Sequence, residues 1–295
     1  MQPVESLYGL KSRVDRFFKA PPKRQPLALQ LTLKLDGTIG LPNNKDEPFK
    51  SPTDFINNLS KTFPSTEIYL FGGLLRDLAI FGRKGFSSDI DIVIDGDCQN
   101  FFEYISTLGA TLNKFGGYRL NVAGWPVDIW NARHTWAIAQ GFVRYDSIES
   151  LTKTTILNWD AILMNWRSRE LICEKNYIDS IKKRKMDVVL LHNPNPKGAA
   201  VRVFRHLCLK DAKSITEATA QYLASSTKLY QLQDLKSYEL YSYSNSFIEP
   251  SIYEFFKKIR ELEDLAIRDR FTAASRSLLE RGIAPPYKQL KWSFL

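Results

Sequence analysis

Residues 88–95 read Ser-Asp-Ile-Asp-Ile-Val-Ile-Asp, a stretch in which acidic and aliphatic side chains alternate. Successive side chains of a β-strand point to opposite faces, so this alternation predicts a half-buried strand. The isoleucines would enter a core, while Asp89 and Asp91 would lie side by side on the other face. Two close carboxylates repel each other unless a cation lies between them. The stretch therefore predicts a magnesium site or, as the alternative, two acids on an exposed strand face.

A glycine pair precedes this stretch, between a predicted strand at 67–71 and a predicted helix at 74–81. Glycine lets the backbone approach a ligand closely, and the free N–H groups at a helix start point towards an anion. Gly72 and Gly73 are therefore expected to bind phosphate. Arg76 lies in the first turn, where the helix dipole disfavours a cation, and a bound polyphosphate would relieve that conflict. The alternative is an ordinary turn with a solvated arginine.

A third acid lies in a predicted hairpin. Residues 118–122 and 125–130 read as two strands joined by Ala123-Gly124. The second strand contains Val-Asp-Ile, which repeats the apolar–acid–apolar order of the first stretch. Asp128 is therefore expected to leave its strand on the same side as the two earlier acids and to complete the metal site.

Together these residues resemble the nucleotidyltransferase superfamily of DNA polymerase beta, and within it the head of tRNA nucleotidyltransferases and bacterial poly(A) polymerases. The family motif Gly-Gly-x-x-Arg-Asp matches residues 72–77, its Asp-x-Asp matches residues 89–91, and its third acid matches Asp128. The resemblance covers about residues 67–130. It implies an α+β fold, with a mixed-sheet nucleotidyltransferase head followed by a mainly helical C-terminal region.

The resemblance also implies an activity, the transfer of a nucleoside monophosphate from a nucleoside triphosphate to an acceptor hydroxyl with release of pyrophosphate. Asp89, Asp91 and Asp128 would be the catalytic residues and would bind two Mg²⁺ ions, or Mn²⁺ in their place. The glycine pair and Arg76 would bind the β- and γ-phosphates. The implied acceptor is an RNA, with the 3′ end of a tRNA as the first choice.

The downstream motifs depart from the family. Asp160 matches the acid of the next motif, but Asn158 and Trp159 stand where two arginines are expected. Arg202 and Arg205 lie in a segment that resembles the arginine-rich helix of these enzymes. The resemblance makes Asp160 and both arginines nucleotide-binding candidates, although the arginines could equally be solvated helix residues. At the start of that helix, Ala199 replaces the acid that reads the incoming base in tRNA nucleotidyltransferases.

These departures favour a specialised relative, such as a toxin or defence protein that adds nucleotides to tRNA, over a housekeeping CCA-adding enzyme. Two alternatives differ in kind. One is an adenylyltransferase that acts on a protein or a small molecule. The other is a catalytically dead nucleic-acid-binding module, against which the three intact acids argue because an inactive site has no need to gather repelling charges.

The chain has 295 residues, of which 44% are hydrophobic, so it can bury a core and form more than one domain. We expect an N-terminal arm or hairpin at 1–50, the nucleotidyltransferase head at 51–192 and a helical C-terminal domain at 193–295. The arm would contain an alternating strand at 27–35. A turn-rich joint at 193–198 would connect the head to the helices, and apolar residues at helical spacing over 252–267 would form a core.

A net charge of +9, from 41 basic and 32 acidic residues, favours a polyanionic partner. Basic residues at 182–185, and basic and aromatic residues at 287–292, could bind RNA or could be solvated charge runs. The 3 cysteines are far apart, which indicates reduced thiols. No membrane-spanning run and no secretion signal are seen, so a cytoplasmic location is expected. The oligomeric state is not predicted.

Overall fold

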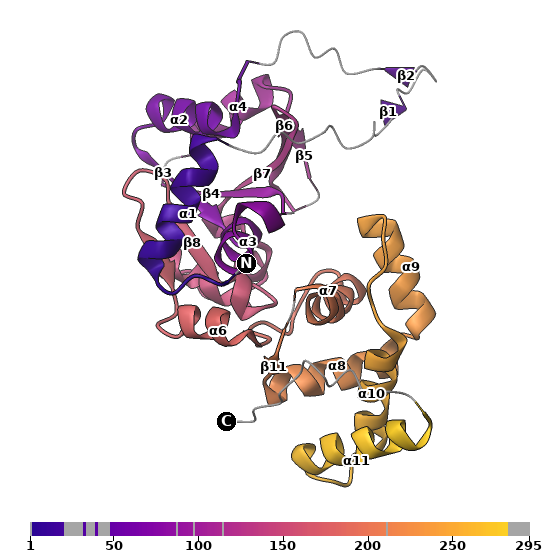
Figure 1. Ribbon diagram of the computed structural model, residues 1–295. Helices are drawn as coiled ribbons and strands as arrows, with labels where there is room; N and C mark the ends of the chain where they lie inside the picture. The colour runs from indigo at the N-terminus through magenta and orange to yellow at the C-terminus, as the bar shows by residue number, and fades with distance from the viewer. Residues whose placement is uncertain are drawn as a thin grey trace. The chain divides into compact units, whose positions relative to one another are not determined.

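The computed structural model describes residues 2–20, 32–33, 39–40, 48–86, 88–96, 98–113, 115–210 and 212–282. The chain divides into two compact units (Figure 1). The first unit comprises Met1–Thr152 and Ile162–Glu174, and the second comprises Lys153–Ala161 and Lys175–Leu295. The expected boundary at residue 192 therefore differs from the division by packing, which assigns residues 175–192 to the second unit.

The first unit is built on a mixed seven-stranded sheet with the strand order β5-β6-β7-β4-β3-β8-β9 (Figure 1). Its strands are β3 (Thr66–Phe71), β4 (Ile90–Gly96), β5 (Thr111–Leu112), β6 (Tyr118–Val122), β7 (Trp125–Asn131), β8 (Ile162–Asn165) and β9 (Leu171–Cys173). Strands β4 and β7 are parallel, and the other neighbouring pairs are antiparallel. The predicted α+β class is thus confirmed for the described residues.

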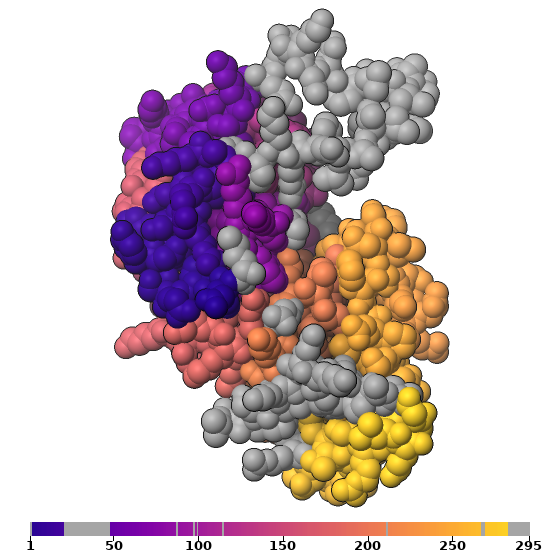
Figure 2. Space-filling view, viewed as in Figure 1, coloured from indigo at the N-terminus to yellow at the C-terminus, as the bar shows by residue number. Residues whose placement is uncertain are grey.

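The helices of this unit are α1 (Leu7–Lys19), α2 (Pro52–Thr62), α3 (Gly73–Ile80), α4 (Gln99–Thr107) and α5 (Trp136–Ala139), with 3₁₀ turns η1 (Arg83–Gly85), η2 (Ala132–His134) and η3 (Ile148–Lys153). Helix α1 contacts α2 and α3, and its outer face is the indigo surface in Figure 2. It is amphipathic, because Leu10, Val14 and Phe17 are buried on one side. Ser6 caps its first turn.

The alternation along β4 divides the sheet into two faces. Ile90, Ile92 and Ile94 are fully buried on one face, as the sequence predicted. The opposite face has Asp91 and then Val93, and Val93 packs with Phe71, Leu151 and other side chains into a second apolar cluster. Residues 132–152 therefore cover the far part of this face and leave the aspartate end less enclosed.

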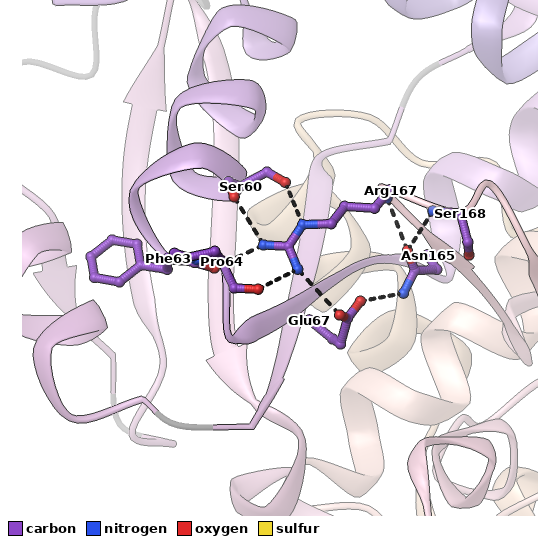
Figure 3. Close-up of polar contacts among 7 residues, drawn as sticks. All are labelled: Ser60, Phe63, Pro64, Glu67, Asn165, Arg167 and Ser168. Carbon is purple, nitrogen blue, oxygen red and sulfur yellow. Dashed lines mark hydrogen bonds and ion pairs between the residues drawn. The ribbon is translucent and has the colours of Figure 1, made fainter.

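Arg167 fastens the sheet to α2 (Figure 3). Its guanidinium donates hydrogen bonds to the carbonyls of Ser60, Phe63 and Pro64, to the Ser60 hydroxyl and to the Glu67 carboxylate. The carbonyls at the end of α2 have no partner within the helix, and a cation there also complements the helix dipole. Arg167 thus joins the turn after β8 to the end of α2 and the start of β3.

The second unit is mainly helical. Its helices are α6 (Tyr177–Lys183), α7 (Pro196–Leu209), α8 (Glu217–Leu229), α9 (Leu232–Tyr243), α10 (Pro250–Glu261) and α11 (Ile267–Glu280), with a 3₁₀ turn η4 (Asn158–Asp160) and two short strands, β10 (Lys185–Met186) and β11 (Ser214–Ile215). Helix α10 contacts α8 and α11, and α7 contacts α9. The predicted helical C-terminal region is confirmed, apart from this small parallel pair of strands.

Some expectations differ from the structure, and others lie outside the described residues. Asn195 caps α7 inside the second unit, so the stretch 193–198 starts a helix there and does not join the two units. The apolar stripe is buried in α10, whereas Leu265 lies beyond the end of that helix and is 41% exposed. The segment expected to be an arm or hairpin, 1–50, contains α1, which packs on α2 and α3, and a short antiparallel pair of β1 (Thr32–Leu33) and β2 (Ile39–Gly40). The rest of the strand expected at 27–35, and the stretch 287–292, lie outside the described residues.

No helix within the described residues is long and apolar enough to cross a membrane.

Candidate active site

The strand register brings two of the predicted acids together. Asp91 on β4 is the direct neighbour of Asp128 on β7 in the parallel pairing of these strands. Residues paired in this way point to the same face, so both carboxylates lie on the less enclosed end of the sheet. Asp89 precedes the first residue of β4, whereas the sequence pattern placed it within the strand. It therefore reaches the site from the loop that enters β4.

Arg119 on β6 connects the acids, and the sequence analysis did not single it out. Its guanidinium donates two hydrogen bonds of 2.9 Å to the Asp128 carboxylate and one of 3.1 Å to the Asp89 carboxylate. A register signal was present in the sequence. A two-residue turn at Ala123 and Gly124 pairs Arg119 directly with Asp128 in the antiparallel hairpin. Both turn residues have positive φ, as a tight hairpin of this kind requires.

The electrostatics of this cluster reflect its mixed environment. Burial raises the pKa of Asp128; the hydrogen bonds and charge of Arg119 oppose that rise, and the charge of Asp89 adds to it. For Arg119, burial lowers the pKa, but the hydrogen bond to Asp128 and the neighbouring carboxylates outweigh it and leave the pKa raised. The guanidinium therefore stays charged, and the cluster places cationic charge between the Asp89 and Asp128 carboxylates.

The glycine pair forms the sharp turn that sequence analysis expected. Gly72 has φ of 64° and ψ of −119°, which disfavours a residue with a side chain, and its N–H bonds to the carbonyl of Ile162. Gly73 begins α3, and a Cβ at that position would lie 3.0 Å from the Ser88 hydroxyl oxygen. Within the described residues no side chain caps the first turn of α3. Backbone N–H groups at this turn are thus close to the segment that delivers Asp89.

Arg76, which was expected to bind phosphate, bonds to protein groups in this structure, and its role in phosphate binding stays a prediction. It is 6% exposed, its Nε bonds to Asp77 at 2.9 Å, and its Nη2 bonds to the Ser88 hydroxyl at 2.9 Å. The Ser88 hydroxyl in turn donates to Asp77 at 2.8 Å. The conflict between Arg76 and the helix dipole is thus relieved by the Asp77 carboxylate. This network fixes the loop before β4, and hence Asp89, relative to α3.

A pocket of about 220 Å³ adjoins the paired acids. Asp91 and Asp128 line it together with aromatic side chains that include Phe115, Trp130 and Trp136. We call it the aromatic pocket. The sequence pattern around Asp128 already contained Trp130, but nothing in the sequence predicted that residues 132–136 would fold back over the strand.

The donor chemistry of this end of the sheet suits a hard divalent cation, because carboxylate oxygens come from β4, from β7 and from the loop before β4. In the described part of the chain, however, no group of three or more histidine, cysteine, aspartate or glutamate side chains is arranged to bind a metal ion. The contacts of Arg119 give the reason, since its guanidinium bonds to the Asp89 and Asp128 oxygens that a metal would use. A cation would therefore compete with Arg119 for these oxygens.

The other three nucleotide-binding candidates belong to the second unit. Asp160 is 8% exposed in η4, next to Trp159, whose indole bonds to the Lys185 carbonyl. Arg202 is exposed on α7. Arg205 forms a 2.7 Å ion pair with the fully buried Glu239. In this structure Arg205 thus stabilises its own unit, and a role for these residues in nucleotide binding stays a prediction.

No family model matches the chain, and no curated protein matches it significantly. Solved structures similar to it include apo form I of a CCA-adding enzyme, with 18% identity and a TM-score of 0.47 over 78% of this chain and 63% of that chain. A Thermotoga maritima CCA-adding enzyme complexed with tRNA has 16% identity and a TM-score of 0.47 over 75% and 64%. A tRNA nucleotidyltransferase complexed with a primer tRNA and an ATP analog has 16% identity and a TM-score of 0.43 over 81% and 64%. The chain thus spans less than two thirds of each of these structures.

Proposed function

We propose that this chain is a metal-dependent nucleotidyltransferase, which transfers a nucleoside monophosphate from a nucleoside triphosphate to an acceptor hydroxyl. One observation carries the proposal. Asp91 and Asp128 are register neighbours on one sheet face, and the loop that delivers Asp89 is packed against the Gly72–Gly73 turn. Phosphoryl transfer needs little from a protein beyond placement and charge stabilisation, and this arrangement combines an acidic cation site with backbone N–H donors.

In this proposal Asp89, Asp91 and Asp128 would hold the divalent ions. A bound ion would neutralise phosphate charge and lower the pKa of the acceptor hydroxyl. The Gly72 N–H bonds to the Ile162 carbonyl, so the N–H groups from Gly73 onwards, in the first turn of α3, would bind the outer phosphates. Arg76 acts indirectly, because its bonds to Asp77 and Ser88 fix the loop that holds Asp89.

The reaction balances without a further reactant. The acceptor oxygen forms a bond to the α-phosphorus, and the bond from that phosphorus to the pyrophosphate oxygen breaks, so the bonding electrons leave with pyrophosphate. Asp128 accepts the proton of the acceptor hydroxyl. Asp128 suits this role because it is the acid on the β7 side, away from the glycine turn beside β3.

The acceptor is proposed to be RNA. The net charge of +9 favours a polyanion, and the aromatic pocket beside Asp128 offers surfaces on which bases stack. No contact in the described residues bears on a toxin or defence role.

The direct test incubates the protein with each α-labelled nucleoside triphosphate, Mg²⁺ and total cellular RNA, and then resolves the products on a gel. Label is expected on RNA with release of pyrophosphate, and the Asp91→Asn variant is expected to give neither. Label on protein or on a small molecule would identify an adenylyltransferase instead. If no nucleotide and no acceptor gives pyrophosphate, the chain is a binding module and the proposal is wrong.

A further inference from the structure

The aromatic pocket lies on one particular side of the acids. In the sheet order, β7 and β6 lie on one side of β4, and β3 with its Gly72–Gly73 turn lies on the other. The pocket is lined by Asp91 and Asp128, with Gly117, which directly precedes β6. The described residues that line it include neither glycine of the turn nor Asp89. It is therefore on the side away from the proposed phosphate site.

The walls of the pocket are held in place by their own contacts. The Trp130 indole donates a 3.0 Å hydrogen bond to the Thr135 hydroxyl and packs edge-on against Phe71 at 6.0 Å between ring centroids. Trp136 packs against Phe142 with 5.3 Å between centroids. Aromatic rings that are fixed in this way make stacking surfaces that lose little side-chain freedom when a ligand binds.

The size of the pocket limits its occupant. Sites for drug-sized ligands measure about 300–1,000 Å³, whereas this pocket measures about 220 Å³. It therefore has room for about one planar ring system, and the rest of a ligand bound there would extend out of the pocket. A ring between aromatic walls, with carboxylates at one edge, is the environment that stacks a base and leaves its sugar near the acids.

We propose that the aromatic pocket binds the terminal base of the acceptor RNA and so places its terminal hydroxyl at Asp128. This inference rests on the proposed function, and it adds the acceptor subsite to it. The incoming nucleotide would occupy the opposite side, where its phosphates meet the glycine turn. The single-stranded end of an RNA offers an unpaired base of this kind.

The test measures binding and needs no turnover. A short 5′-labelled single-stranded RNA is compared with the same RNA whose last nucleotide lacks its base, by fluorescence anisotropy. For the wild-type protein, loss of the base is expected to weaken binding roughly 5- to 150-fold, the range for one stacked base. In Trp136→Leu and in Phe115→Leu this ratio is expected to fall towards one, because leucine keeps apolar surface but removes the ring.

Two features make the variants interpretable. Phe115 is 44% exposed, so its replacement is expected to leave the fold intact even if Trp136→Leu does not fold. Tyr8→Leu is the matched control in the same unit, because Tyr8 is 79% exposed on α1 and lies outside the pocket. This control is expected to keep the wild-type ratio.

Other results would overturn the inference. A wild-type protein that binds both RNAs equally has no base pocket for the acceptor. An unchanged ratio in both leucine variants would place the base elsewhere. If the variants weaken nucleoside triphosphate but not tripolyphosphate, the pocket holds the incoming base. A further possible result is that the wild-type affinity depends on the terminal base and both variants remove that dependence, while no nucleotide transfer is found. That combination would support the base pocket and refute the proposed nucleotidyltransferase activity.

Discussion

Arg119 and Arg205 both contact carboxylates, yet their surroundings differ. Arg119 is 54% exposed, and its one guanidinium bonds to both Asp89 and Asp128. Arg205 is 11% exposed and pairs with Glu239, which is fully buried. Glu239 also accepts hydrogen bonds from the Ser246 hydroxyl and from the backbone N–H groups of residues 247 and 248.

The pKa shifts of Glu239 and Asp128 have opposite signs. Burial raises the pKa of Glu239, but the backbone, arginine and serine hydrogen bonds outweigh it, and the pKa is lowered. Burial also raises the pKa of Asp128, and there the hydrogen bonds of Arg119 do not outweigh it. Glu239 in the second unit thus has several hydrogen-bond donors, whereas Asp89 and Asp128 in the first unit share one arginine, Arg119. We therefore expect the acids of the first unit, and not Glu239, to be able to bind an added cation.

The largest effect is expected at Asp91, which is one of the three acids proposed to hold the divalent ions and the register neighbour of Asp128. The Asp91→Ala substitution should reduce nucleotide transfer by at least about 10³-fold, because it removes several kcal/mol of charge stabilisation in the transition state. The fold should survive, since the change relieves repulsion between acids, and circular dichroism with thermal melting would check this. Asp95→Asn, on the same strand and face, is the matched control and should keep most of the activity. Near-normal turnover in Asp91→Ala would refute the site.

Glu239 should show the reverse, a large loss of stability with no direct role in catalysis. Glu239→Ala leaves Arg205 buried without its carboxylate, and the expected cost is about 3–5 kcal/mol in the free energy of unfolding. Glu239→Gln, which can still accept hydrogen bonds, should cost less and serves if the alanine variant does not fold. Glu254→Gln, at a partly exposed helix pair with Lys257, should change stability by less than about 0.5 kcal/mol. A wild-type melting curve in Glu239→Ala would abolish the contrast with Arg119.

The difference in unfolding free energy between the wild type and Glu239→Gln should also depend on pH. The folded-state pKa of Glu239 lies below the ordinary value of 4.5. Its contribution is therefore fully present above that value and is lost as the pH falls through the folded-state pKa. Denaturant unfolding of wild type and Glu239→Gln should thus converge in acid and separate towards neutral pH. A gap that widens in acid would contradict the sign of this shift.

The sequence predicted the parts of this structure that depend on local pattern. Alternation around Asp91 and Asp128 gave both strands, and the glycines gave the turn before α3. Arg76 shows the limit of prediction from local pattern. It bonds to the adjacent Asp77 and to Ser88, which lies in the loop before β4. The family resemblance assigned Arg76 to phosphate, and a local pattern cannot show that a buried carboxylate already pairs with it.

Long-range packing accounts for what the sequence did not reveal. The short 3₁₀ turn at 158–160 joins the second unit through bonds such as that from Trp159 to the Lys185 carbonyl. No periodicity in the sequence predicts that residues 158–160 pack with the second unit. The aromatic pocket likewise forms only when the segment containing Trp136 folds over β7. In contrast, the pairing of Arg119 with Asp128 followed from the hairpin register and could have been read from the sequence.

A substitution at Arg167 would show whether a charged side chain with many hydrogen-bond partners, such as Glu239 in the second unit, also stabilises the first unit. Arg167→Ala removes its bonds to three carbonyls, the Ser60 hydroxyl and Glu67, and should lower the free energy of unfolding by about 1–3 kcal/mol. The guanidinium is 30% exposed, so water can satisfy part of what is lost. Arg144→Ala, at an ion pair whose arginine is 89% exposed, is the control and should be nearly neutral. Equal melting curves for the two variants would show that hydrogen-bond saturation is a poor guide to structural arginines.

The smallest expected effect, and the most specific, concerns Arg119 and metal binding. If its guanidinium competes with a cation for Asp89 and Asp128, Arg119→Ala should bind Mn²⁺ more tightly by roughly five-fold, which corresponds to about 1 kcal/mol for a half-exposed pair. Arg119→Lys keeps the charge and should stay near wild type, so the two variants separate charge from shape. Electron paramagnetic resonance titration of free Mn²⁺ measures this without turnover. Weaker binding in Arg119→Ala would mean that Arg119 organises the acids for the cation, and the proposed competition would be wrong.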